Sequence, residues 1–210
     1  MAGWRVGTAG WTYPEWRGGF YPEDLPRRRH LEWYARTFDS VEVNGTFYGL
    51  PDEATVRGWV AAVPDGFTFA LKASRYVTHM KKLKDPEDSL ERFLEVAGWF
   101  GPACGPLLYQ LPPRWKANLE RLEAFLEALP GGHRHVFEFR DPSWLTDECA
   151  ALLERHGAGF CIYELAGFLS GKRVTADFAY VRLHGPGAAY AGDYDDETLA
   201  GWAGAASAWL

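Results

Sequence analysis

The chain has 210 residues, 47% of them hydrophobic and 24% charged, and its formal net charge is −6 at pH 7. This length is enough for a sizeable core, and we expect a single domain over residues 1–210. The acidic balance argues against a protein that coats nucleic acid or membranes through bulk charge, although it is compatible with a local basic groove.

The cysteines and the start of the chain bear on its compartment. Cys104, Cys149 and Cys161 are widely spaced and form no CxxC pair, which predicts reduced thiols rather than a disulfide framework or a zinc site. The first expected strand begins near Trp4, so we expect no signal peptide. No apolar run reaches the roughly 20 residues of a membrane span. We therefore expect a cytoplasmic protein with no membrane partner.

Short apolar strands alternate with helical segments along the whole chain. The strands are expected at about 4–8, 40–44, 67–72, 106–111, 135–140, 159–164 and 179–184. Between them, apolar residues recur at i, i+3, i+4 and i+7 over 31–38, 56–63, 90–97 and 122–129, and a shorter helix is expected at about 147–156. This alternation predicts an α/β fold with a parallel sheet and right-handed crossovers.

Two α/β architectures compete, a closed (β/α) barrel and an open doubly wound sheet. An open sheet usually carries a glycine-rich phosphate loop after its first strand, whereas residues 7–13 match neither GxGxxG nor GKS/T. In a barrel, one face of each strand points at the helices and the other points into the lumen. Five of the strands place apolar residues on one face and polar residues on the other, so we expect a TIM-type (β/α) barrel.

The number of strands is one short of that barrel. Seven are expected, whereas a TIM-type barrel has eight strands in about 250 residues. The chain ends at Leu210, within the helix expected after the seventh strand. We therefore expect a truncated barrel that lacks its C-terminal strand and helix and has unpaired strand edges.

Polar residues recur near the C-terminal ends of these strands with the same parity. Side chains alternate between the two faces of a strand, so Glu42 and Asn44 share one face opposite Val41 and Val43. In barrels, polar residues at these strand ends tend to form the active site. We expect the following side chains to converge on one polar site: Glu42, Asn44, Lys72, Gln110, Glu138, Arg140, Arg182 and His184.

Six motifs, taken in order, resemble one known family. They read GWTYPEW at 10–16, EVNGTFY at 42–48, KAS at 72–74 with TH at 78–79, QLPPRW at 110–115, EFRDPSW at 138–144 and YVRLHG at 180–185. Over nearly its whole length the chain resembles the YecE-like family, catalogued as domain of unknown function 72. The resemblance implies a TIM-type barrel in a bacterial or archaeal cytosolic protein, with no established reaction. Members of that family carry a further strand ending in Asn-Asn, which supports the expected truncation.

The charged residues suit acid/base chemistry on an anion. Two carboxylates in different environments can divide the roles of acid and base, and we expect Glu42 and Glu138 to do so. His184 can assist near neutral pH, while Arg140 and Arg182 suit bidentate recognition of an anionic group. The alternative is a structural ion network that fills the lumen, with His184 as an ordinary hydrogen-bonded core residue.

Lys72 has two interpretations. A deprotonated Lys72 would be a Schiff-base nucleophile, but two nearby carboxylates favour a protonated Lys72 that neutralises a substrate phosphate or carboxylate. Glu42, Glu138, His79 and His184 are donor types that bind metals. There is no local spacing such as HExxH, and three cations lie nearby, so we expect neither a metal nor a cofactor.

Aromatic and basic residues suggest a second class of ligand. Trp11, Tyr48 and Trp144 are expected to face a ligand, because aromatic rings stack on sugars and nucleobases. Trp16 and Phe47 are expected to cover the barrel top instead. The segment 72–84 is basic; a charge run is usually a solvated face, but beside an aromatic rim it can follow a phosphate backbone.

The leading hypothesis is an enzyme, a hydrolase, lyase or isomerase, that performs proton transfer or hydrolysis on a small anionic or polyhydroxylated substrate. The alternative is a module that binds or processes nucleic acid through segment 72–84 and the aromatic rim. A glycosidase ranks third, because the separation of the two carboxylates decides between retaining and inverting geometries. The sequence leaves the oligomeric state open. The expected catalytic residues are Glu42, Glu138 and His184, and the expected substrate-binding residues are Trp11, Asn44, Tyr48, Lys72, His79, Gln110, Arg140, Trp144 and Arg182.

Overall fold

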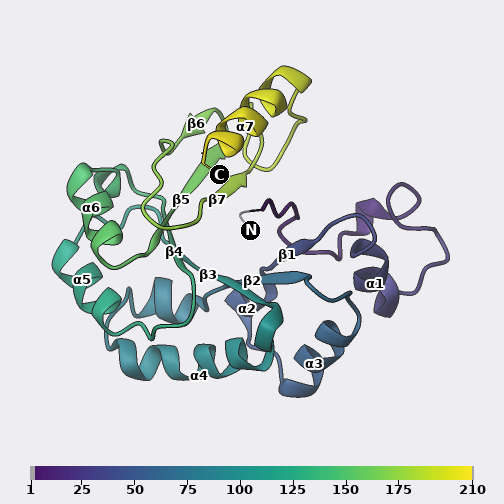
Figure 1. The fold of residues 1–210 in the computed structure, drawn as a ribbon, viewed down its shortest axis with the longest axis horizontal. Helices are drawn as coiled ribbons and strands as arrows, with labels where there is room; N and C mark the ends of the chain where they lie inside the picture. Colours follow the sequence, from purple (N-terminus) through teal and green to yellow (C-terminus); the bar gives the residue numbers. More distant parts are fainter. Residues whose placement is uncertain (1–2, 210) are drawn as a thin grey trace. The chain divides into compact units, whose positions relative to one another are not determined.

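The structure is a computed structural model that describes residues 3–209 (Figure 1). Strands and helices alternate along these residues, and the chain forms two compact units. The N-terminal unit comprises residues 4–108, and the C-terminal unit comprises residues 109–209 together with Gly3. Strand β3 (Cys104–Leu111) begins in the N-terminal unit and ends in the C-terminal unit.

Parallel strands form the sheet of the N-terminal unit. Strand β1 (Ser40–Val43) pairs with β2 (Thr68–Lys72), and β2 pairs with the first residues of β3. Side chains such as Val43, Phe69 and Leu71 are buried, as the strand pattern predicts. The hydroxyl oxygen of Thr46 lies 2.7 Å from the carbonyl oxygens of both Val43 and Lys72, and its single proton links the ends of β1 and β2.

Helices and short turns connect these strands. Helix α3 (Glu53–Ala61) is capped by the side chain of Asp52, which accepts a hydrogen bond from the backbone N–H of Thr55. Helix α4 (Pro86–Trp99) begins with Pro86, a residue that is favoured in the first turn of a helix. Segment Tyr76–Met80 is a π-helix, a form that is often found at functional sites. The helices are α1 (His30–Tyr34), α2 (Gly45–Tyr48), α3 (Glu53–Ala61) and α4 (Pro86–Trp99), with short 3-10 turns at Pro14–Trp16, Arg27–Arg29 and Gly101–Ala103.

The strand predicted at residues 4–8 does not form. The carboxylate of Asp39 accepts the backbone N–H of Val6 at 3.0 Å, which takes this donor out of a strand ladder. One ladder-like bond remains, from the N–H of Glu42 to the carbonyl oxygen of Thr8 at 3.0 Å. At Gly7 the backbones approach so closely that a Cβ would lie 2.1 Å from the carbonyl oxygen of Ser40, so only glycine fits there.

The C-terminal unit is built on β5. This strand (Gly159–Leu165) runs parallel to β4 (His135–Phe139) and parallel to β7 (Tyr180–Leu183). A tight turn at Ala166–Gly167 then leads into the short antiparallel strand β6 (Phe168–Leu169). All five residues of β4 are buried, as expected for a parallel strand covered on both faces.

Three capped helices complete the C-terminal unit. They are α5 (Leu119–Glu127), α6 (Asp147–Arg155) and α7 (Asp196–Ala208), and Pro142–Trp144 forms a short 3-10 turn. Just before each helix, a side-chain oxygen accepts a hydrogen bond from a backbone N–H of the first turn. These capping side chains are Asn118 for α5, Thr146 for α6 and Asp195 for α7. These caps explain why the helices begin where they do.

The α/β class and the parallel pairing predicted from the sequence are confirmed. Apart from residues 4–8, each predicted strand has a counterpart within a few residues of its predicted bounds. Over residues 3–209, no helix combines the length and the apolar character that crossing a membrane requires.

A buried histidine makes the C-terminal unit sensitive to acid. In β4, the Nδ1 of His135 lies 3.2 Å from the Tyr109 hydroxyl and its Nε2 lies 3.0 Å from the carbonyl oxygen of Pro130. The carbonyl can only accept, so Nε2 carries the proton and Nδ1 accepts from Tyr109. Burial lowers the pKa of His135 below its ordinary 6.5, so the folded state takes up this proton less readily than the unfolded state.

We therefore expect the free energy of unfolding to fall as pH drops from 7.5 to 5. The stability that neutral His135 contributes is present above the pKa of the unfolded state and is lost as pH falls below it. The loss is on the order of 1 kcal/mol for each unit by which the pKa differs between the folded and unfolded states. Urea titrations of His135→Gln should show a weaker pH dependence, whereas His156→Gln, at an exposed histidine of the same unit, should behave as the wild type. An unchanged slope in His135→Gln would contradict this assignment.

Candidate functional site

A fully buried carboxylate lies at the centre of the candidate site. Glu138 is on β4 and its side chain has no solvent exposure. Each of its two oxygens forms an ion pair and accepts a hydrogen bond from an arginine. Oε1 accepts from Nε of Arg140, and Oε2 accepts from Nη1 of Arg182. These two guanidinium groups are themselves almost buried, with 8% and 7% of their side chains exposed.

Strand geometry brings these residues together. Glu138 and Arg140 are two residues apart, so they share one face at the end of β4. Arg182 lies on β7, and β5 lies between β4 and β7. The small side chain of Cys161 on β5 lets Arg182 reach across, and its thiol donates weakly to Oε2 of Glu138 at 3.8 Å.

Arg140 also contacts a histidine and an aromatic ring. Its Nη2 lies 3.0 Å from Nε2 of His184, just beyond β7. Because a guanidinium can only donate, Nε2 of His184 is the acceptor, and His184 is neutral with its proton on Nδ1. The guanidinium carbon of Arg140 lies 4.6 Å from the centre of the Tyr163 ring, a cation–π contact. Burial raises the pKa of Tyr163 to about 12, so this ring stays neutral.

The electrostatics of the cluster keep Glu138 ionised. Burial opposes ionisation, but the charges of Arg182 and Arg140 outweigh it and hold the pKa of Glu138 below its ordinary 4.5. Because Glu138 is held ionised, it suits the role of a base or an electrostatic role better than the role of an acid. The two guanidinium groups are of a kind that binds phosphate and carboxylate groups.

Two further predicted residues lie in the C-terminal unit. Gln110 is half-buried near the end of β3. Trp144 is completely buried: its indole N–H donates to the carbonyl oxygen of Trp115 at 2.7 Å, and its ring stacks on Phe139 at 5.1 Å. The sequence predicts that Trp144 faces a ligand, but its ring has no exposed surface that a ligand could contact.

The N-terminal unit holds the other predicted polar residues. Glu42 is 7% exposed on β1. The Asn44 amide donates to the carbonyl oxygen of Ala9 at 3.0 Å, while its buried Oδ1 has no hydrogen-bond partner among the described residues. Because Glu42 and Glu138 lie in different units, their pairing as acid and base stays a prediction.

Lys72 and His79 share an aromatic neighbour. The Lys72 ammonium lies 4.7 Å from the centre of the Phe47 ring, and the His79 ring meets the same ring edge-on at 5.0 Å. Thr78 Oγ1 lies 2.9 Å from Nδ1 of His79. Burial and then the charge of Lys72 lower the pKa of His79, so His79 is neutral at pH 7.

The predicted aromatic rim divides into two kinds of residue. Tyr48 is 76% exposed at the end of α2, so its ring is open to a ligand. Trp11 is half-buried and packs edge-on against Trp59 at 5.2 Å. Sequence reasoning missed Cys161 and Tyr163, which both contact the Glu138 cluster. Cys161 and Tyr163 are two residues apart on β5, so they share the face opposite Ile162. This spacing is the feature of the sequence from which they could have been predicted.

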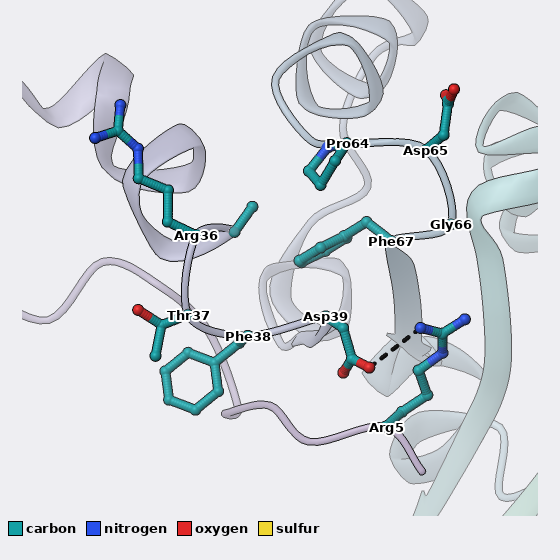
Figure 2. A pocket seen from close by; sticks show the side chains of 10 residues that line it. Arg5, Arg36, Thr37, Phe38, Asp39, Pro64, Asp65, Gly66 and Phe67 are labelled. Atoms are coloured by element: carbon teal, nitrogen blue, oxygen red, sulfur yellow. Dashed lines mark hydrogen bonds and ion pairs between the residues drawn. The ribbon is translucent and has the colours of Figure 1, made fainter. Parts of the chain in front are cut away.

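Metal-ligand clusters and cavities are the other features of residues 3–209 that bear on a site. Within residues 3–209, no group of three or more histidine, cysteine or acidic side chains is arranged to hold a metal ion. A cavity of about 270 Å³ in the N-terminal unit lies at the opposite ends of β1 and β2, before Ser40 and Thr68. Figure 2 shows Arg5 reaching to Asp39 across this cavity, a solvent-accessible ion pair at 3.1 Å.

Comparisons with known proteins agree on one family. A family model described as "Protein of unknown function DUF72" matches residues 5–209. The UPF0759 protein YecE of Escherichia coli strain K12 is 32% identical over an alignment of 143 residues, and the match covers 67% of this chain and 50% of that protein. The UPF0759 protein YunF of Bacillus subtilis strain 168 is 26% identical over an alignment of 153 residues, and that match covers 67% of this chain and 52% of that protein. The chain thus spans about half the length of the curated relatives that it matches.

Solved structures support the fold. A DUF72 family protein from Thermotoga maritima MSB8 aligns over 97% of this chain and 86% of its own, with a TM-score of 0.84 and 28% identity. A DUF72 family protein from Enterococcus faecalis V583 aligns over 98% and 84%, with a TM-score of 0.74 and 18% identity, which bears on the fold alone.

The buried cluster predicts a large effect of neutralising Glu138. Glu138→Gln keeps the size of the side chain but leaves two nearly buried guanidinium groups without their carboxylate. We expect urea denaturation to show a loss of about 3–5 kcal/mol in the free energy of unfolding. Glu53→Gln is the matched control, since it breaks an ion pair with Arg57 that is 48% and 71% exposed, and its loss should be much smaller. Equal losses would contradict the cluster's role in stability.

Proposed function

Because the chain belongs to the DUF72 family, whose description names no reaction, we propose a function from its own residues. The proposed function is an enzyme that performs acid/base chemistry, proton transfer or hydrolysis, on a small anionic or polyhydroxylated substrate. The proposal keeps the cytoplasmic location expected from the sequence. It applies to the part of the protein contained in this chain, which covers about half of its curated relatives.

The observation that carries the proposal is the Glu138 cluster. A carboxylate without solvent exposure accepts from two guanidinium groups, and one of these also donates to a neutral histidine. All four residues stand at or just beyond the C-terminal ends of the parallel strands β4 and β7. Perturbed carboxyl groups with specific charged partners are typical of functional sites.

Each member of the cluster has a proposed role. Glu138 is held ionised, so it acts as a base or stabilises a developing positive charge. Arg140 and Arg182 bind the substrate anion through their guanidinium groups, which suit bidentate recognition of a phosphate or carboxylate. His184 transfers a proton through the ring nitrogen that does not bond Arg140. Glu42, the second catalytic carboxylate predicted from the sequence, belongs to the other unit and its role stays a prediction.

We also propose that the parallel strands belong to a TIM-type (β/α) barrel. The alternation of strands and helices and the parallel pairings within each unit support this proposal. In TIM-type barrels the active site lies at the C-terminal ends of the strands. The missing eighth strand expected from the sequence stays a prediction.

A second candidate function is binding of single-stranded nucleic acid by the N-terminal unit. The observation that favours it is the segment around the π-helix Tyr76–Met80, where Arg75, Lys82 and Lys84 are exposed. Tyr76 is 44% exposed there and offers a ring for stacking. Lys81, by contrast, pairs with Asp85 at 2.8 Å and contributes less to attracting a phosphate.

A thermal-shift screen tests the enzyme proposal with sugar phosphates, sugar acids, neutral sugars and nucleotides. We expect an anionic ligand at 100 times its dissociation constant to stabilise the protein by about 2.7 kcal/mol. At this size that energy raises the melting temperature by roughly 5–10 °C. The shift should disappear in Arg140→Met and persist in Arg155→Met, an exposed arginine of the same unit. Shifts with neutral sugars only, or equal shifts in both variants, would refute anion recognition by Arg140.

Salt titrations with a short oligonucleotide test the second candidate. Affinity should fall steeply with salt, and Lys82→Gln/Lys84→Gln should lower the slope of log affinity against log salt by about 1.4, for two lost phosphate contacts to a single strand. The control is Arg27→Gln/Arg28→Gln, two exposed cations elsewhere in the N-terminal unit. Binding that is insensitive to salt, or equally weakened by both double variants, would dispose of this function.

A further inference from the structure

The loop after β7 is tightly held around Gly185. The backbone N–H of Gly185 donates to the Tyr194 hydroxyl at 3.0 Å, and its carbonyl oxygen accepts from the N–H of Ala166 at 3.1 Å. Gly185 has a φ of +105°, and a Cβ there would lie 2.5 Å from the carbonyl oxygens of Ala188 and Ala191. Only glycine therefore allows the chain to fold back so closely after His184.

This loop holds Tyr190 in an unfavourable backbone conformation. Tyr190 has a φ of +60°, which is uncommon for a residue other than glycine, asparagine or aspartate. Its N–H donates to the carbonyl oxygen of His184 at 2.6 Å, which maintains this conformation. Strain of this kind is often retained where a side chain has a function to perform.

The Tyr190 ring is exposed next to the polar cluster. It is 73% exposed, and its centre lies 5.3 Å from the centre of the His184 ring at an interplanar angle of 68°. His184 in turn accepts the hydrogen bond from Arg140. A large ring thus stands beside His184, which contacts the proposed anion-binding residue Arg140, and most of the surface of this ring is open. Burial in the core does not explain its position.

We propose that Tyr190 is a substrate-binding residue that stacks on a sugar ring whose phosphate or carboxylate is bound by Arg140 and Arg182. The ring of an aromatic residue packs well on the apolar face of a sugar, while the sugar hydroxyls are suited to the carboxylate, imidazole and guanidinium groups of the cluster. The substrate class is therefore an anionic cyclic sugar. This inference rests on the proposed function, because it concerns the same site.

Calorimetric titration of the chain with a set of phosphates, which includes adenosine monophosphate, and one sugar acid tests the inference. Ribose 5-phosphate carries a ring, glycerol 3-phosphate and inorganic phosphate do not, and glucuronate combines a ring with a carboxylate. We expect a cyclic probe, ribose 5-phosphate or glucuronate, to bind about tenfold more tightly than the two phosphates without a ring, which corresponds to one stacking contact. Comparing the two cyclic probes then distinguishes a phosphate from a carboxylate as the anionic group.

Variants separate the role of the ring from that of the loop. Tyr190→Ala should remove the preference for cyclic probes without changing the affinity for inorganic phosphate, and Tyr190→Phe should keep the preference. Tyr190→Gly removes the ring but tolerates the positive φ, so it should match Tyr190→Ala if the loop keeps its shape. An unchanged preference in Tyr190→Ala and Tyr190→Gly would overturn the inference.

The remaining outcomes distinguish this inference from the proposed function. If phosphate binds and Arg140→Met abolishes that binding, but the wild type shows no preference for cyclic probes, the role of Tyr190 is refuted and anion recognition stands. If adenosine monophosphate binds more tightly than ribose 5-phosphate and this gain is lost in Tyr190→Ala, the ring stacks on a nucleobase and the sugar assignment is overturned. If no probe binds, both proposals fall.

Discussion

The C-terminal unit depends on the pairing of one buried carboxylate with two guanidinium groups. Removing Glu138 from water costs several kcal/mol, and the arginines repay it only when they are in direct contact with both oxygens. That requirement restricts the surrounding sequence. Arg140 must be two residues from Glu138, Arg182 must come from a strand on the far side of β5, and the intervening residue, Cys161, must be small.

A paired buried charge is weak evidence for stability, since apolar residues of similar volume often stabilise a core as well. The composition of this cluster therefore bears on its function. Besides the carboxylate and its two arginines, the cluster holds a histidine whose Nε2 accepts from Arg140. An ionised carboxylate close to a neutral imidazole, at the C-terminal ends of parallel strands, is the physical basis for the proposed acid/base function.

Burial decides which aromatic residues of the chain are accessible to a ligand. Trp144 follows a strand end, as a ligand-contacting residue would, but its ring and its N–H are both satisfied within the core. Tyr190 lies in a loop without a recognisable motif, yet it is exposed in a conformation that costs free energy. In the N-terminal unit, Lys72 and His79 both pack on Phe47, so this aromatic ring contacts two polar side chains.

The sequence by itself determined the family, the α/β class, most of the strands and helices, and the polar residues of the strand ends. These follow from local periodicity, because side chains alternate along a strand and recur every three to four residues along a helix. Tertiary structure decided the rest. Residues 4–8 have a strand pattern, but the Asp39 carboxylate takes a donor that pairing would need. Likewise, only packing shows that Glu138 shares Arg140 with His184 and Tyr163, that Trp144 is buried and that Tyr190 is exposed. Ion pairing and burial are relations between residues far apart in the chain, so local patterns do not contain them.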